Sequence, residues 1–84
     1  MMKYSKLRGI PTNYDYSKLR GRIVECFGKQ HSFAAAMGIA ERTMSLKLNN
    51  LSGWHQHEID KACGILRIPC NEIHEYFFTH NTQY

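Results

Sequence analysis

The chain is 84 residues long, with a net charge of +4 and an isoelectric point of about 9.1. This length suits one small domain, and a hydrophobic share of 43% excludes an intrinsically disordered chain. No apolar run is long enough to span a membrane, and the N-terminus lacks the apolar core of a signal peptide, so we expect a cytoplasmic protein. Eleven Lys and Arg against seven Asp and Glu are weak support for a nucleic-acid partner.

Residues 1–12 are predicted to be a tail. The six-residue sequence at 4–9 recurs unchanged at 16–21, and Pro11 disfavours helix directly after the first copy. Two interpretations stay open. The tail is either a passive, solvated segment, or a basic arm in which Lys3, Lys6 and Arg8 contact phosphates.

The first of five predicted helices covers residues 17–27. Asp15 or Ser17 can cap its start, and Gly28 is placed to end it. Gly21 in its interior costs about 1 kcal/mol relative to alanine, and we expect it to allow a close helix crossing. Leu19, Ile23 and Phe27, each four residues from the next, form its apolar stripe. Val24 and Cys26 are expected to widen that stripe.

The remaining helices are predicted at residues 30–37, 41–49, 55–66 and 71–78, with Gly38 ending the second and Asn71 capping the fifth. Trp54 is expected to seal the core under the loop 50–54. Residues 81–84 are expected to fray, so the domain should cover 13–80. The side chains predicted to face the core are Phe33, Ala34, Met37, Met44, Leu48, Ile59, Ala62, Cys63, Leu66, Ile73, Tyr76 and Phe77.

Cysteine and histidine usage argues against a disulfide framework, a metal site or an enzyme. The odd set Cys26, Cys63 and Cys70 contains no Cys-x-x-Cys pair, and we expect the first two to be buried thiols. Cys70 and His74 are four residues apart, but no second ligand pair accompanies them. Because no nucleophile, carboxylate pair or phosphate loop is recognisable, we expect neither catalysis nor a cofactor.

The stretch 30–49 is the most informative part of the chain. It reads as a short helix, a corner opened by Gly38, and a second helix that starts at Glu41. This spacing is typical of a helix-turn-helix, in which two helices cross steeply around a tight turn. In a small basic chain the motif predicts that the second helix enters a DNA major groove.

Three segments carry a resemblance to a known family. They are Tyr-Asp-Tyr-Ser-Lys-Leu-Arg-Gly-Arg-Ile-Val-Glu at 14–25, Glu-Arg-Thr-x-Ser-Leu-Lys-Leu-Asn-Asn at 41–50, and Glu-Ile-x-x-Tyr-Phe-Phe at 72–78. With them the chain resembles the Cro and repressor class of phage helix-turn-helix regulators, in particular small phage-encoded Cro-like proteins. The resemblance implies an all-α, compact five-helix domain of the lambda-repressor type. It also implies a regulator that binds double-stranded operator DNA in the host bacterium and influences the choice between lysis and lysogeny.

The resemblance also implies roles for eight residues. Gln30 would contact a phosphate, and the second motif helix would meet base edges through Glu41, Arg42 and Leu46. Arginine can bind guanine, glutamate can accept from cytosine, and leucine can contact a thymine methyl group. The residues implied nearer the DNA backbone are Thr43, Ser45, Lys47 and Asn49.

An alternative is a modulator or antirepressor that binds the phage repressor and alters its DNA binding. Arg42 and Lys47 are the only cations of the predicted second motif helix, and Ala40 stands where many relatives carry a capping Ser or Thr. Exposed Leu46 and acidic Glu41 would suit a protein interface. Two further acids, Glu58 and Glu72, could face a basic DNA-binding surface.

A homodimer is a further expectation. The three adjacent aromatic residues Tyr76, Phe77 and Phe78 cannot all face one small core. The fifth helix is therefore the predicted surface of a homodimer in one interpretation; in the other, Phe78 is only half-exposed beside a loose terminus, and the oligomeric state stays open.

Overall fold

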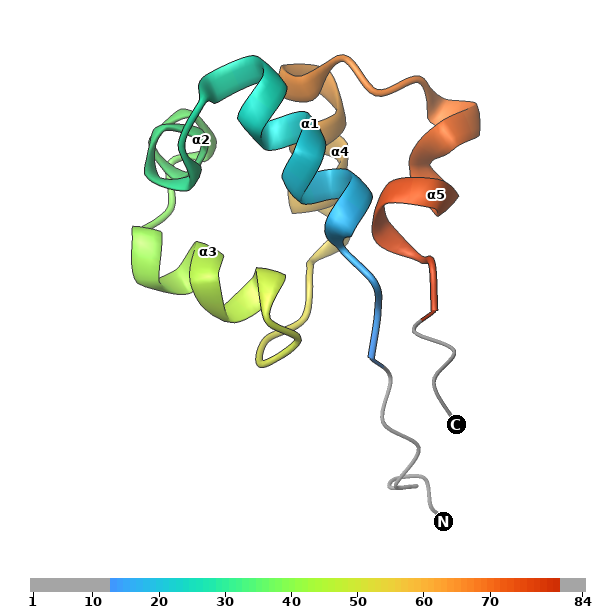
Figure 1. The fold of residues 1–84 in the computed structure, drawn as a ribbon, viewed down its shortest axis with the longest axis horizontal. Helices are drawn as coiled ribbons and strands as arrows, with labels where there is room; N and C mark the ends of the chain where they lie inside the picture. The colour runs from blue at the N-terminus through green and yellow to red at the C-terminus, as the bar shows by residue number, and fades with distance from the viewer. Residues whose placement is uncertain (1–12, 81–84) are drawn as a thin grey trace, which may run out of the picture.

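The computed structural model describes residues 13–80. The first copy of the duplicated sequence, the proposed basic arm at 1–12 and the fraying expected at 81–84 concern residues outside this range, whereas the second copy lies within it. The elements are α1 (Ser17–Phe27), α2 (Gln30–Met37), α3 (Glu41–Leu48), α4 (Gln56–Leu66), the 3-10 turn η1 (Cys70–Glu72) and α5 (Ile73–Phe77), arranged as in Figure 1. The all-α, five-helix prediction is confirmed. Within 13–80 no helix has the length and apolar character that crossing a bilayer requires.

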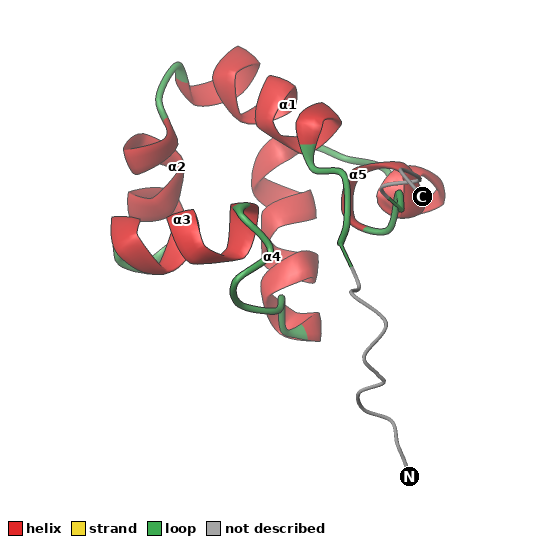
Figure 2. Cartoon of the chain, turned by 60° about the horizontal axis from the view of Figure 1, so that its bottom comes forward, coloured by secondary structure: helices red, strands yellow, loops and turns green. Residues whose placement is uncertain are grey.

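One apolar core holds the five helices together. Each helix supplies one large side chain that is fully buried: Leu19, Phe33, Met44, Leu66 and Phe77. Figure 2 shows α2 and α3 next to each other on one side and α5 on the other, with α1 and α4 between them. Because these five side chains belong to one cluster, helices from the beginning and the end of the domain both help to fix the position of α3.

Helix α1 has the predicted bounds but a narrower apolar stripe than expected. Leu19 and Ile23 are buried, whereas Val24 is 59% exposed and Cys26 is also exposed. The prediction that these two residues widen the stripe, and that Cys26 is a buried thiol, is wrong. Each helical residue turns about 100° from its neighbour, so a residue beside a core position faces solvent when only one side is covered. The second thiol, Cys63, is buried as predicted.

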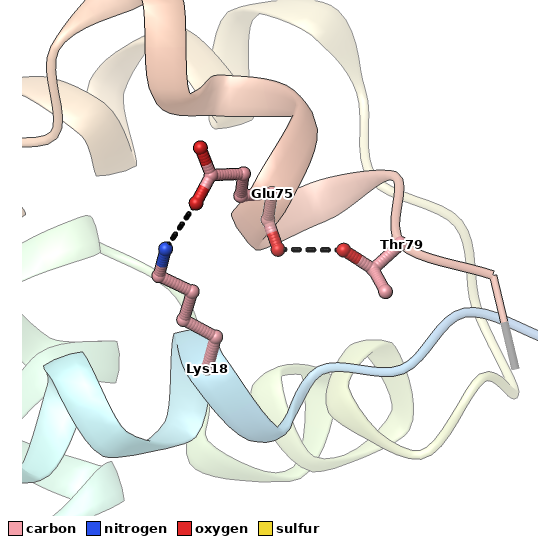
Figure 3. Close-up of polar contacts among 3 residues, drawn as sticks. All are labelled: Lys18, Glu75 and Thr79. Carbon is pink, nitrogen blue, oxygen red and sulfur yellow. Dashed lines mark hydrogen bonds and ion pairs between the residues drawn. The ribbon is translucent and has the colours of Figure 1, made fainter.

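The start of α1 is tied to the end of the chain. The Asp15 carboxylate accepts hydrogen bonds from the Ser17 N–H and hydroxyl, while the Asp15 N–H donates to the Thr79 carbonyl at 2.7 Å. Lys18 pairs with Glu75, and the Thr79 hydroxyl donates to the Glu75 carbonyl at 2.8 Å (Figure 3). These exposed contacts position α5 against α1, although an ion pair in solvent adds little stability.

Gly21 makes no close helix crossing, contrary to the prediction. A Cβ built on it would meet nothing within 4 Å, and the same is true of Gly28, whose φ of +78° ends α1. We therefore expect Gly21→Ala to raise the free energy of unfolding by about 0.5–1 kcal/mol. Gly28→Ala should lower the free energy of unfolding by about 1 kcal/mol, because Gly28 has a positive φ and Gly21 does not. Urea unfolding of both variants measures the difference, and equal effects would contradict this explanation.

The C-terminal half departs from the predictions in detail. α3 ends at Leu48 rather than residue 49, α4 starts at Gln56 with His55 as its N-cap, and the predicted helix 71–78 divides into η1 and α5. Asn71 lies inside the 3-10 turn and caps nothing. Pro69, extended at ψ 150°, is the residue before that turn, and the division between η1 and α5 falls at Glu72, whose φ of −112° and ψ of 0° lie outside helical geometry.

The aromatic residues behave differently from one another. Phe77 is buried, Tyr76 is half-buried and Phe78 is 38% exposed. The three adjacent aromatic residues therefore expose less surface to solvent than the sequence suggested. The homodimer through α5 stays a prediction. Trp54 packs edge-on against Phe77, with ring centroids 5.1 Å apart, as expected for a residue that seals the core. Burial raises the pKa of the Tyr16 phenol, and the nearby Trp54 indole reduces that rise. The buried Nε1 of Trp54 has no hydrogen-bond acceptor within residues 13–80.

Candidate functional site

The helix-turn-helix geometry is built around Gly38. This residue adopts the left-handed conformation (φ 77°, ψ 25°), and its N–H donates to the carbonyls of Ala34 and Ala35 at the end of α2. Ile39 donates to Ala34 at 3.1 Å and packs against the core, so the chain turns sharply into α3. The sequence prediction of two packed helices around a glycine corner is confirmed.

Helix α3 has one buried face and one solvent face. Met44 and Leu48 are buried, as predicted, and hold the helix on the core. Glu41 and Arg42 are exposed, and Leu46 is 36% exposed. We call these three residues the outer face of α3. Their side chains have the access that contact with a macromolecule requires.

Four further residues of the predicted DNA surface are partly engaged inside the domain. The Gln30 amide donates to the Ser45 hydroxyl at 3.1 Å, which joins α2 to α3. The Asn49 amide donates to the Ser45 carbonyl at 2.8 Å and its oxygen accepts from Arg20 at 3.0 Å. Thr43 and Ser45 are half-buried. The structure thus brings Gln30, Ser45 and Asn49 together, but as links between helices.

Lys47 requires a correction, because it does not lie on the solvent face. Its side chain is 3% exposed, and its Nζ lies 2.8 Å from a Glu58 carboxylate oxygen and donates to the Gly53 carbonyl at 2.8 Å. Position 47 follows Met44 by three residues, so it falls on the buried side of the helix. An ammonium held in this way cannot reach a phosphate unless the buried pair first breaks.

Glu58 is likewise internal, although the sequence analysis offered it to a partner. Its carboxylate accepts the His55 N–H at 2.8 Å at the start of α4 and pairs with Lys47. Burial alone would raise the pKa of Glu58, but the hydrogen bonds from Lys47 and from the His55 backbone outweigh it, so the pKa lies below its ordinary value. The spacing of Glu58 three residues after the N-cap is a capping-box signal present in the sequence.

The described part of the chain is close to electrically neutral. Of the eleven Lys and Arg, three (Lys3, Lys6 and Arg8) belong to residues 1–12, which leaves eight against all seven Asp and Glu, a net charge of +1. Arg42 is the only cation on the outer face of α3, and Glu41 stands beside it. Affinity for DNA depends on the number of phosphates that cations neutralise, so this face is a poor match for a DNA backbone.

Comparison with known proteins places this architecture. A family model matches residues 12–80, nearly the whole chain. The chain belongs to that family, which is described as a protein of unknown function, DUF739. It is similar to the solution structure of the modulator of repression (MOR) of the temperate bacteriophage TP901-1 from Lactococcus lactis. The two are 51% identical with a TM-score of 0.71, over 77% of this chain and 88% of that one. No curated protein matches the chain.

One exposed residue of this DUF739 domain escaped the sequence analysis. Leu51 is 74% exposed in the loop after α3, and its N–H donates to the Leu46 carbonyl at 2.8 Å. Leu51 therefore places a second exposed aliphatic side chain beside the C-terminal end of α3. A leucine between the turn residues Asn50 and Ser52 was the available signal, because nothing in a loop of that kind requires an apolar residue.

Proposed function

We propose that this DUF739 chain modulates phage repression by binding the phage repressor protein through the outer face of α3. Support comes from the likeness to a protein named modulator of repression, at 51% identity. The observation that carries the proposal is the chemistry of that face: an exposed leucine, one acid and one arginine, with Lys47 withdrawn into a buried ion pair.

The chemistry of a repressor complements this face. A repressor presents cations where it meets phosphates, and Glu41 offers such a surface a carboxylate. Leu46 and Leu51 supply apolar contact area, which DNA phosphates cannot use but a protein surface can. Binding there would cover the repressor's DNA surface or change its choice of operator.

Direct operator binding is the second candidate function. The confirmed helix-turn-helix and the exposure of Glu41, Arg42 and Leu46 favour it, because these are the residues that would meet base edges. The phosphate contacts would then come from Gln30, Thr43, Ser45 and Asn49. If this candidate holds, Arg42→Ala should relax preference at one base pair and cost about 1–3 kcal/mol of discrimination.

Fluorescence anisotropy separates the two candidates. A labelled duplex from the early intergenic region of the encoding phage is titrated with the chain alone, at low and at moderate salt, and then with the repressor present. We expect no sequence-specific binding by the chain alone, and we expect the chain to change the affinity of the repressor for the duplex when both proteins are present. Specific binding by the chain alone that weakens steeply with salt would contradict the proposal, because that slope counts neutralised phosphates.

A further inference from the structure

Two adjoining hollows line the side of the domain next to the loop that follows α3. Their volumes are about 380 Å³ and about 1070 Å³, and both are bounded by Trp54, Ile59 and Phe78. Tyr14 and Leu51 stand at the end nearer α3, and Asp60 stands at the other end. We call this surface the Trp54 groove.

The Trp54 groove lies beside the loop that follows the C-terminal end of α3. Leu51 lines the groove, is 74% exposed, and is hydrogen-bonded through its N–H to the Leu46 carbonyl. Phe78, on the opposite wall, is 38% exposed. The groove therefore exposes one aliphatic and one aromatic side chain, and the aliphatic one follows the last residue of α3 by three positions.

The charge in the groove points to the chemistry of the occupant. Asp60 is the only acidic residue that lines the two hollows, and His57 is the only basic one. Within residues 13–80 its carboxylate makes no ion pair, and the neighbouring Lys61 is turned to the Met37 carbonyl at 3.0 Å. A groove that exposes Leu51 and Phe78 beside a carboxylate without an ion pair disfavours DNA and suits an apolar side chain flanked by a cation.

We propose that the Trp54 groove receives an apolar side chain of the repressor, with a Lys or Arg next to it that pairs with Asp60. This inference rests on the proposed function and adds a second contact region to it. A buried apolar anchor of this kind is where interfaces concentrate their binding energy. The repressor would thus be held both on the outer face of α3 and in the groove beside it.

Trp54 is the only tryptophan of the chain and reports directly on the groove. The full-length chain is labelled with fluorotryptophan, and its single fluorine resonance is followed by NMR as unlabelled repressor is added. We expect the resonance to shift in proportion to the complex formed. Phe78→Ser, at a residue that lines both hollows, and Asp60→Lys should each weaken the repressor complex about tenfold, as anchors and complementary charges do.

Val24→Ser is the matched control, because Val24 is 59% exposed on α1 and lines neither hollow. It should leave the affinity unchanged, and thermal melts should show all three variants folded. A repressor complex with normal affinity in both groove variants, and an unmoved fluorine resonance, overturns this inference and leaves the proposed function standing. Absence of any repressor complex overturns both. A shift that depends only on the concentration of the chain itself assigns the groove to a second copy and also overturns the inference.

Discussion

Replacing Lys47 by alanine is expected to lower the free energy of unfolding by about 3–5 kcal/mol, because the change leaves Glu58 as an unpaired charge in a largely buried site. The Gly53 carbonyl loses its donor as well. A small domain has only about 5–15 kcal/mol of stability in total, so much of this variant should be unfolded at moderate temperature. Urea unfolding at neutral pH gives the value.

A double-mutant cycle isolates the pair from the packing of the lysine stem. Lys47→Met keeps an unbranched side chain at this position but removes the ammonium that lies over the Trp54 ring, and it leaves Glu58 unpaired. Combining it with Glu58→Gln removes both charges and keeps an acceptor for the His55 N–H. We expect the double variant to recover most of the loss seen in Lys47→Met alone. A loss below about 1 kcal/mol for Lys47→Ala would be typical of an exposed pair and would contradict the buried position.

Acid should weaken the domain through the same group. Because the folded-state pKa of Glu58 lies below its ordinary value of about 4.5, its contribution to stability is complete above that pH and is lost as the pH falls through the folded-state pKa. The difference in stability between the natural chain and Glu58→Gln should therefore shrink on acidification. A difference that stays constant from neutral pH to acid would show that Glu58 has the same pKa in both states.

Leu46→Glu is expected to weaken the repressor complex by about 2 kcal/mol, roughly thirtyfold, because it places a charge where the outer face of α3 offers its apolar anchor. The fold should tolerate the change, since Leu46 is partly exposed and glutamate is a good helix former. Val24→Glu places the same charge on an exposed aliphatic position of α1 and serves as the control. Titration calorimetry with the repressor measures both variants.

Equal affinities for Leu46→Glu and Val24→Glu would remove α3 from the interface. Binding of the same variants to the operator duplex is measured as well. If operator binding alone is lost in Leu46→Glu while repressor binding persists, the outer face of α3 is a DNA surface and the second candidate function is correct.

Local patterns in the sequence were sufficient to predict most of the scaffold. Glycines at 28 and 38 mark the ends of α1 and α2 because both adopt positive φ, and the spacing of Leu19 and Ile23 gave the buried stripe of α1. The end of the chain was harder. The 3-10 turn before α5 depends on Pro69 and on packing around Phe77, and periodicity cannot separate such a turn from the helix that follows it.

The candidate site was less predictable because its chemistry depends on distant partners. Lys47 looks like a surface cation until Glu58, in the next helix, is placed against it. The net charge of +4 likewise suggests a basic domain, although three of its cations belong to residues 1–12 and leave +1 for the described part. Charge counted along a chain does not show where that charge faces a partner.

Chemical-shift mapping of the isotope-labelled chain tests the central claim most directly, because it shows which partner touches α3. The chain is titrated in parallel with full-length repressor and with operator duplex, and the amide resonances of α3 and of the following loop are compared. Our account predicts that the repressor shifts the amide resonances of Glu41, Arg42, Leu46 and Leu51. It predicts that operator DNA alone leaves those resonances unchanged. Shifts of these residues with operator DNA, and none with repressor, would contradict it.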